Sequence, residues 1–283
     1  MCSSDLAVKI NNLKYADLKT LSDIKDPVPL EIFISILKNQ NSDCDPEVCF
    51  EEDGYLYSGI LNSISLKETM FGTRVVGYIN IISKSSENYV IGEKTVNLPY
   101  VSFVKSVNDL GLKEIDDNMR NELTERGRKY INVTKKPHYC SYKGYVLSEG
   151  FMGDVRDSVN SRVMIDINAM RLLNPRTSDY WYEGEVFNSD DVVGENVPEN
   201  MLWMTSPAVY GFAFGNKLWC KMNIDNISEI EFSKNAFDEL IIPQANKNIF
   251  IASLTHTMPS LDSIEDKGEG KIFLLYGAPG VGK

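Results

Sequence analysis

The sequence predicts an α+β fold, in which a β-rich N-terminal region with helices is followed by the first strand of an α/β module. Residues 48–104 contain runs of β-branched and aromatic residues separated by glycine turns, which is typical of strands. Residues 112–131 place apolar side chains at helical spacing. The apolar run Ile272–Tyr276 ends at a glycine-rich segment, as a buried parallel strand does when it leads into a ligand-binding loop.

Composition limits the classes of protein to consider. The chain has 283 residues, of which 43% are hydrophobic and 10% aromatic, enough for the core of one large domain or two ordinary ones. The 29 Lys and Arg against 40 Asp and Glu give a net charge of −11. Nucleic acid and membrane surfaces are therefore not expected as partners, because binding to either needs clustered positive charge. The net charge does not exclude a local basic groove.

Cysteine usage and the lack of targeting signals predict the compartment. The five cysteines are scattered and form no CxxC pair, a pattern typical of reduced thiols in a cytosolic environment. No segment reaches the roughly 18–20 apolar residues that span a bilayer, and the N-terminus lacks a signal peptide. We expect an intracellular protein, cytoplasmic in the first place, with the nucleus as the alternative.

Residues 1–45 form an N-terminal segment with one apolar stretch, Leu30–Leu37. Pro27 and Pro29 precede it and restrict the backbone where the element begins. The stretch fits either a helix or a short strand, and both interpretations stay open.

Residues 46–150 are expected to form a β-rich domain. Its predicted strands are Tyr55–Ile60, Thr73–Ile82 and Tyr89–Val96. A helix is predicted over Leu112–Ile131, where one side is apolar and the other carries oppositely charged residues four positions apart.

Residues 151–235 are expected to form a second β-rich region. Ser161–Asp166 predicts a strand, and Phe212–Phe214 with Lys217–Met222 predicts a hairpin. The two residues between them, Gly215 and Asn216, suit a tight turn because glycine tolerates a positive φ.

Two charged groups are interpreted as solvated surface. Residues 183–200 carry six acidic side chains and no basic one, and nothing spaces these carboxylates around a common point, so a loop is favoured over a metal or cationic-ligand site. Basic residues in and after the predicted helix could attract an acidic partner, but their charge pairing favours a solvated face. They are Arg120, Arg126, Arg128, Lys129, Lys135 and Lys136.

Other constellations are poor candidates for chemistry. His138 lies near Cys140 in the sequence, but packing is a better interpretation than a nucleophile pair. The cysteines and histidines lack the closely spaced ligand pair of a zinc site. We predict no metal ligand and no catalytic residue within residues 1–283.

Residues 236–283 carry the one motif with a clear mechanism. Phe237–Pro243 is followed by a predicted helix to about Met258 and a strand over Lys271–Tyr276. Gly277-Ala278-Pro279-Gly280-Val281-Gly282-Lys283 then matches G-x-x-x-x-G-K. In such a loop the backbone N–H groups bind phosphate oxygens and the lysine neutralises the β/γ-phosphate charge.

The alternative to a phosphate-binding loop is an ordinary glycine turn. Two glycines and one lysine at fixed offsets arise by chance in roughly one chain in ten of this length. The apolar run immediately before the loop decides for phosphate binding, because it supplies the strand that such a loop requires.

The sequence resembles the fungal AAA+ ATPases that carry a DUF7025-type N-terminal domain ahead of one AAA+ core. The resemblance covers most of the chain after about residue 30 and ends at the phosphate loop. The matching stretches are residues 121–130, 137–144, 161–166, 206–212, 224–228, 236–240 and 277–283.

The resemblance implies ATP and Mg²⁺ as ligands. Gly277, Gly280, Gly282 and Lys283 match the family's phosphate loop, and Ala278 stands where the family usually has proline. Asp238–Ile242 lies where related ATPases place backbone against adenine, with Asp238 and Leu240 as the expected contacts. The family works as a homo-oligomeric ring that hydrolyses ATP to remodel a protein or complex.

The family's remaining catalytic parts are the Ser/Thr that binds Mg²⁺, the acidic strand and the arginine from a neighbouring subunit. We expect these after Lys283, so that the sequence is an ATPase truncated at its Walker A lysine and residues 1–283 alone are inactive. Two other functions stay open: a protein-binding module without ATPase activity, and a P-loop kinase for a small molecule.

Overall fold

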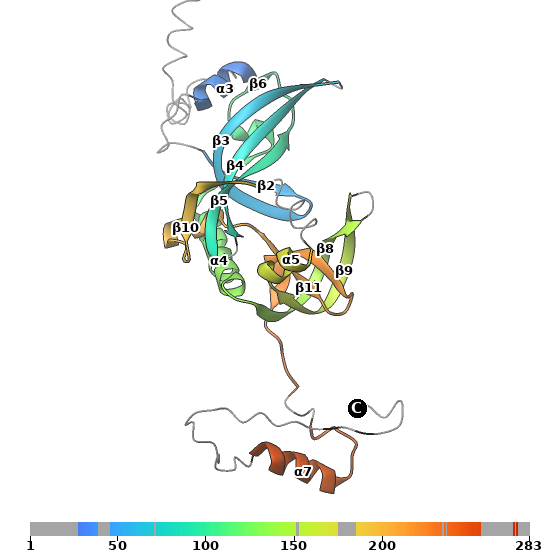
Figure 1. The fold of residues 1–283 in the computed structure, drawn as a ribbon. Helices are drawn as coiled ribbons and strands as arrows, with labels where there is room; N and C mark the ends of the chain where they lie inside the picture. Colours follow the sequence, from blue (N-terminus) through green and yellow to red (C-terminus); the bar gives the residue numbers. More distant parts are fainter. Residues whose placement is uncertain are drawn as a thin grey trace, which may run out of the picture. The chain divides into compact units, whose positions relative to one another are not determined.

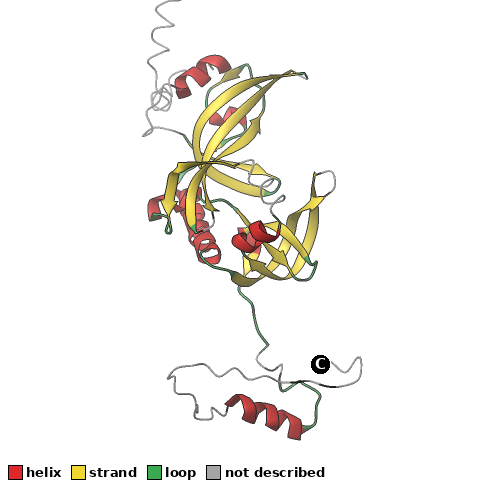
Figure 2. Ribbon diagram, in the orientation of Figure 1, coloured by secondary structure: helices red, strands yellow, loops and turns green. Residues whose placement is uncertain are grey.

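The computed structural model is a strand-rich α+β protein (Figures 1 and 2). It describes residues 28–38, 46–70, 72–85, 87–150, 153–174, 185–233, 235, 237–255, 274 and 276, with the main chain alone at residues 38, 185–191 and 255. Contacts divide the chain into an N-terminal unit, Met1–Ile230, and a C-terminal unit, Glu231–Lys283.

The first sheet of the N-terminal unit has six antiparallel strands in the order β10-β5-β4-β3-β2-β7. The three predicted strands are confirmed and are longer than expected. The strands are β2 Glu47–Glu52, β3 Tyr55–Thr69, β4 Gly72–Ser85, β5 Asn88–Leu98, β7 Lys113–Glu114 and β10 Glu185–Gly194.

The ambiguous N-terminal stretch is a helix, α3, Leu30–Lys38. Its buried residues Leu30, Phe33, Ile34 and Leu37 recur at three- and four-residue spacing and pack into the core beneath the first sheet. A two-residue ladder precedes it, in which β1, Val28–Pro29, pairs with β6, Phe103–Val104.

The long predicted helix is present as α4, Asp117–Thr134, but its predicted start at Leu112 is wrong. Asp116 caps α4 by accepting a hydrogen bond from the Met119 N–H at 2.8 Å. Residues 113 and 114 form β7, because the edge of β2 is available for pairing and the apolar spacing alone does not distinguish the two states.

The second sheet has the order β12-β11-β9-β8-β13, and β12 also pairs with β8. Four of its strands, β8, β9, β11 and β12, therefore close on themselves (Figure 1). The strands are β8 His138–Gly150, β9 Gly153–Ile165, β11 Ala208–Ala213, β12 Leu218–Asn223 and β13 Ile227–Ser228, and a short helix, α5 Ile167–Leu173, follows β9.

The chain passes back and forth between the two sheets. The position between residues 150 and 151, where the sequence suggested a boundary, falls in the connection of the β8–β9 hairpin. β8 precedes this position and belongs to the second sheet, whereas β10 follows it and completes the first. Residues 46–235 are thus interleaved, up to the division near Ile230.

The hairpin predicted at residues 212–222 is confirmed, but its turn differs. Ala213 pairs with Leu218, so the connection has four residues, and the positive φ belongs to Lys217 (55°). Gly215 is required for space instead, because a Cβ there would lie 2.7 Å from the Ser161 Cβ.

The acidic segment predicted as a loop is partly a strand. β10 pairs antiparallel with β5, matching Glu185 with Lys94 and Phe187 with Gly92. The expectation of a loop overlooked Val186, Phe187, Val192 and Val193, whose side-chain types favour a strand once an edge is available. A short helix, η3 Glu199–Met204, follows.

The basic residues around α4 do not all form a solvated face. Arg128 pairs with Glu125 and Glu199 at the surface. The Arg120 guanidinium lies 4.6 Å from the ring centroid of Trp203. Arg126, in contrast, is buried at 8% exposure, because α4 packs against η3 and β3 on that side.

The described cysteines Cys49, Cys140 and Cys220 are free thiols with fully buried side chains, in agreement with the expected reduced state. Burial raises the pKa of both Cys140 and Cys220 from 9.0 to about 12.

We expect these three thiols to be inert toward Ellman's reagent at pH 8 in a variant that carries Cys2→Ser and Cys44→Ser. Because the pKa is higher in the folded state, the protonated thiols stabilise the fold below pH 9 and this contribution is lost as the pH rises toward 12. The same variant in denaturant is the control and should react fully. Rapid reaction of the native protein would contradict the burial.

Candidate functional site

The predicted phosphate loop, Gly277 to Lys283, lies outside the described residues. Of the strand predicted over 271–276, the structure describes Leu274 and Tyr276, and neither is in a helix or strand. Their side chains are 93% and 98% exposed. These two side chains therefore have no cover from any part of the chain that the structure describes.

The predicted adenine-contacting residues Asp238 and Leu240 lie in an exposed turn that leads into α7, Gln244–Thr255. The Lys247 ammonium donates to the Asp238 carbonyl at 2.8 Å, and the Leu240 N–H donates to the Phe237 carbonyl at 3.3 Å. The helix predicted up to about Met258 is confirmed as α7. The turn precedes this helix, and residues 277–283, which would share the nucleotide with it, lie outside the described residues.

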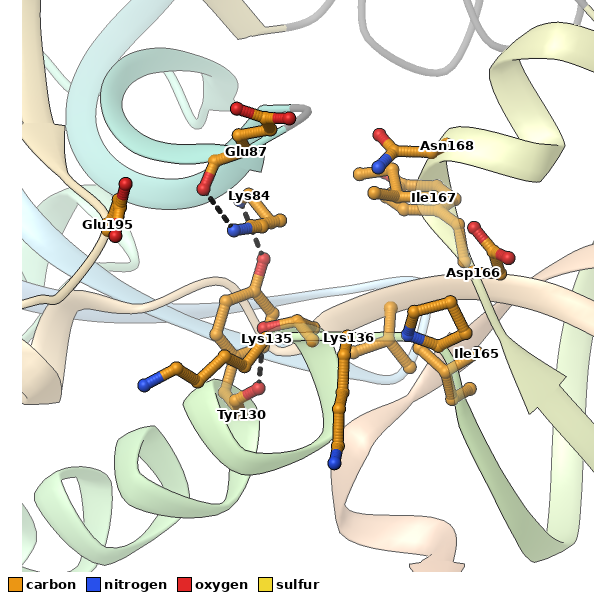
Figure 3. Close-up of a pocket in the computed structure, with 14 residues that line it drawn as sticks. Lys84, Glu87, Tyr130, Lys135, Lys136, Ile165, Asp166, Ile167, Asn168 and Glu195 are labelled. Atoms are coloured by element: carbon orange, nitrogen blue, oxygen red, sulfur yellow. Dashed lines mark hydrogen bonds between the residues drawn. The ribbon is translucent and has the colours of Figure 1, made fainter. Parts of the chain in front are cut away.

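A cavity of about 330 Å³ lies in the N-terminal unit, where the turn between β4 and β5, the end of α4 and the start of α5 meet (Figure 3). Its lining is contributed by segments from both sheets. The lining residues are Lys84, Glu87, Tyr130, Thr134, Lys135, Lys136, Pro137, Ile165, Asp166, Ile167, Asn168, Glu195, Val209 and Tyr210.

Lys84 is the buried charge of this cavity. The residue is 5% exposed, and its ammonium donates to the Glu87 carbonyl at 2.5 Å and lies 4.4 Å from the ring centroid of Tyr89. Burial lowers the pKa of Lys84, and the negative charges of Glu195 and Glu87 oppose that shift. No ion pair among the described residues includes Lys84.

Hydrogen bonds fix the wall around Lys84. The Lys84 N–H donates to the Tyr130 hydroxyl at 3.0 Å, which ties the end of β4 to the last turn of α4. Thr134 Oγ1 donates to the Tyr130 carbonyl at 2.7 Å and lies 3.0 Å from the Tyr89 hydroxyl. These bonds hold the main chain of Lys84, from which the ammonium extends, against α4.

The opposite wall is built by the connection from β9 to α5. Asp166 caps α5 by accepting from the Ala169 N–H at 2.8 Å, and its own N–H donates to the Tyr210 carbonyl at 3.1 Å. These bonds place Ile167 and Asn168 across the open space from Lys84 and Tyr130 (Figure 3). Ile165 and Val209 add apolar surface to the lining.

Sequence reasoning missed this cavity. Its residues are drawn from five segments separated along the chain, and no spacing motif connects them. Lys135 and Lys136 were noted only as part of a charged surface. The one signal available was Lys84, which follows the predicted strand Thr73–Ile82 by two residues, since a lysine that continues an apolar strand is seldom fully buried.

The other chemical candidates stay without a site. His138 Nε2 lies 3.4 Å from Glu229 Oε1, and the high pKa of Cys140 keeps its thiol protonated at neutral pH. The described residues contain no cluster of three or more His, Cys, Asp or Glu that could hold a metal ion. No helix within the described ranges has the length and apolar character needed to cross a membrane.

Comparisons with family models, with curated proteins and with solved structures found no match to this chain. The assignment to AAA+ ATPases therefore stays a prediction from the sequence.

Proposed function

We propose that this chain is the N-terminal part of an AAA+ ATPase, in which ATP hydrolysis by a homo-oligomeric ring remodels a protein or complex. The observation that carries the proposal is the motif Gly277–Lys283 directly behind the apolar run Ile272–Tyr276. Lys283 and the loop N–H groups would bind the ATP phosphates, and Mg²⁺ would be held by residues that follow them.

The division into two units supports separate tasks. The N-terminal unit has its own two sheets and its own buried cores, so it can serve as the part that engages a protein partner. The C-terminal unit contains α7 and the phosphate-loop motif.

The exposure of Leu274 and Tyr276 also supports the proposal. Leaving two large apolar side chains almost fully in water forgoes about 1.5–3 kcal/mol of burial free energy for the leucine alone. A parallel sheet of a nucleotide-binding core would cover both faces of such a strand.

The test is ATP hydrolysis by the protein expressed from its native transcript. Lys283→Ala should lower the rate at least about tenfold, because the lysine neutralises phosphate charge in the transition state. The control is Lys271→Ala, which removes the same charge ahead of the apolar run and should leave the rate unchanged. Equal rates for the two variants would contradict the proposal.

Residues 1–283 by themselves should show negligible affinity for ATP. The helix that follows a phosphate loop contributes its N-terminal dipole and several N–H donors, and these belong to residues after Lys283. Titration with a fluorescent ATP analogue tests this, and micromolar binding would overturn it. If the native transcript stops after Lys283, the protein-binding module is the better function.

A further inference from the structure

We propose that the cavity beside Lys84 binds the carboxylate group of an apolar ligand, with the Lys84 ammonium as the counter-charge. The proposal concerns the N-terminal unit alone and does not depend on ATP hydrolysis. It rests on the place of the ammonium, the pattern of polar and apolar walls, and the balance of charge around them.

The ammonium lies where a bound anion could reach it. Lys84 is 95% buried as a residue yet lines the cavity. Its ammonium has three N–H donors, and among the described residues one hydrogen bond from it is found, to the Glu87 carbonyl. A buried ammonium is stabilised by a paired anion, and no described side chain supplies one within ion-pair distance.

The neighbouring lysines are differently placed. Figure 3 shows the ammonium groups of Lys135 and Lys136 directed away from the open space, whereas the Lys84 ammonium is directed toward the Glu87 carbonyl, across the open space from Ile167 and Asn168. Lys135 instead donates to Asn196 Oδ1 at 3.4 Å. The cavity therefore offers a single buried cation, rather than a cluster.

The charge balance favours a carboxylate over a phosphate. Glu87 and Glu195 are near enough to affect the protonation of Lys84, and Asp166 lines the same cavity. One ammonium can neutralise one negative charge, but a phosphate near pH 7 would bring a second charge toward these carboxylates. A carboxylate adds one negative charge to a lining that already carries Glu87, Glu195 and Asp166, so it meets less repulsion than a phosphate does.

The walls favour an apolar body behind the carboxylate. Ile165, Ile167, Val209 and Pro137 contribute apolar surface, and Asn168 offers an amide on the far side. A volume of about 330 Å³ fits a small molecule or the last one or two residues of a peptide. Both sources carry the same chemistry: an apolar group ending in a carboxylate.

The test uses the full 283-residue chain and N-acetyl-leucine as the probe, with heat of binding and amide chemical shifts of Lys84 and Asn168 as readouts. N-acetyl-leucine should bind at this cavity. N-acetyl-leucinamide, which lacks the charge, and inorganic phosphate should bind at least about tenfold more weakly. Equal binding of the amide or of phosphate would overturn the proposal.

Two pairs of variants locate the charge. Lys84→Met should weaken N-acetyl-leucine binding at least tenfold, and Lys136→Met, a lysine on the same cavity but directed away, should not. Because Lys84→Met could disturb the fold, the exposed Asn168→Asp provides a second variant that brings a repelling carboxylate to the far wall. Asn160→Asp, on an exposed part of β9, is its control. Unchanged binding in Asn168→Asp would also overturn the proposal.

A comparison of peptides separates the two sources. A hexapeptide ending in leucine with a free C-terminus should bind, and its C-terminal amide should not. Tighter binding of the free hexapeptide than of N-acetyl-leucine would identify a protein C-terminus as the ligand, and weaker binding would identify a small molecule. Binding of the amidated hexapeptide with equal affinity would contradict carboxylate recognition.

Discussion

Replacing Arg126 with methionine is expected to lower the free energy of unfolding by about 3 kcal/mol, because two hydrogen bonds from a buried charged group are lost. The guanidinium donates to the Leu56 carbonyl at 2.6 Å and to Ser58 Oγ at 3.0 Å. Hydrogen bonds from a charged group contribute about 1.5–3 kcal/mol each, and methionine fills similar volume without replacing them.

Denaturation of the full chain followed by tryptophan fluorescence measures this effect, since all three tryptophans, at positions 181, 203 and 219, belong to the N-terminal unit. The matched control is Arg128→Met, which removes the same group two residues further along α4. Arg128 is solvent-exposed and paired at the surface, where water screens the ion pairs, so its loss should cost much less than that of Arg126. Similar costs for the two variants would show that the buried contacts of Arg126 do not stabilise the fold.

Gly127→Ala is expected to destabilise the same interface by about 2 kcal/mol or more. A Cβ at this position would lie 2.2 Å from the Leu202 carbonyl oxygen and 2.7 Å from the Leu202 carbonyl carbon. Both are backbone atoms of η3, so α4 and η3 must move apart. On helix propensity alone, the same substitution would stabilise α4 by about 1 kcal/mol.

The two effects of Gly127→Ala change the melting temperature in opposite directions, so thermal unfolding shows which one is larger. Asn132→Ala, at an exposed position of α4, is the control and should be neutral or slightly stabilising because alanine favours a helix. An increase in melting temperature for Gly127→Ala would mean that α4 and η3 do not approach as closely as described.

The sequence was most informative where local pattern and tertiary environment agree. The strands around Tyr55–Ile60 and Tyr89–Val96 were predictable because β-branched and aromatic residues cluster there and glycine turns bound them. The helix over residues 117–134 was predictable from its spacing and charge pairs.

Elements that depend on a distant partner were not predictable. β10 is a strand because β5 presents a free edge, and the acidic composition of the segment gave no sign of that edge. Residues 113 and 114 pair with β2 for the same reason. The burial of Arg126 follows from the approach of η3, which is more than 70 residues away in the sequence.

The candidate sites divide in the same way. The phosphate loop is contiguous, so Gly277–Lys283 could be read from the sequence alone. The cavity beside Lys84 is assembled from separate segments, and only the folded chain brings Lys84 and Asn168 to the same space.

The passage of the chain back and forth between the two sheets has a consequence for synthesis on the ribosome. The first sheet lacks β10 until residues 185–194 have been translated, although its other strands are complete by Glu114. During that interval the β5 edge presents unpaired N–H and C=O groups to other nascent chains. The N-terminal unit thus cannot mature one sheet at a time, and slow translation between residues 115 and 194 should increase its demand for chaperones.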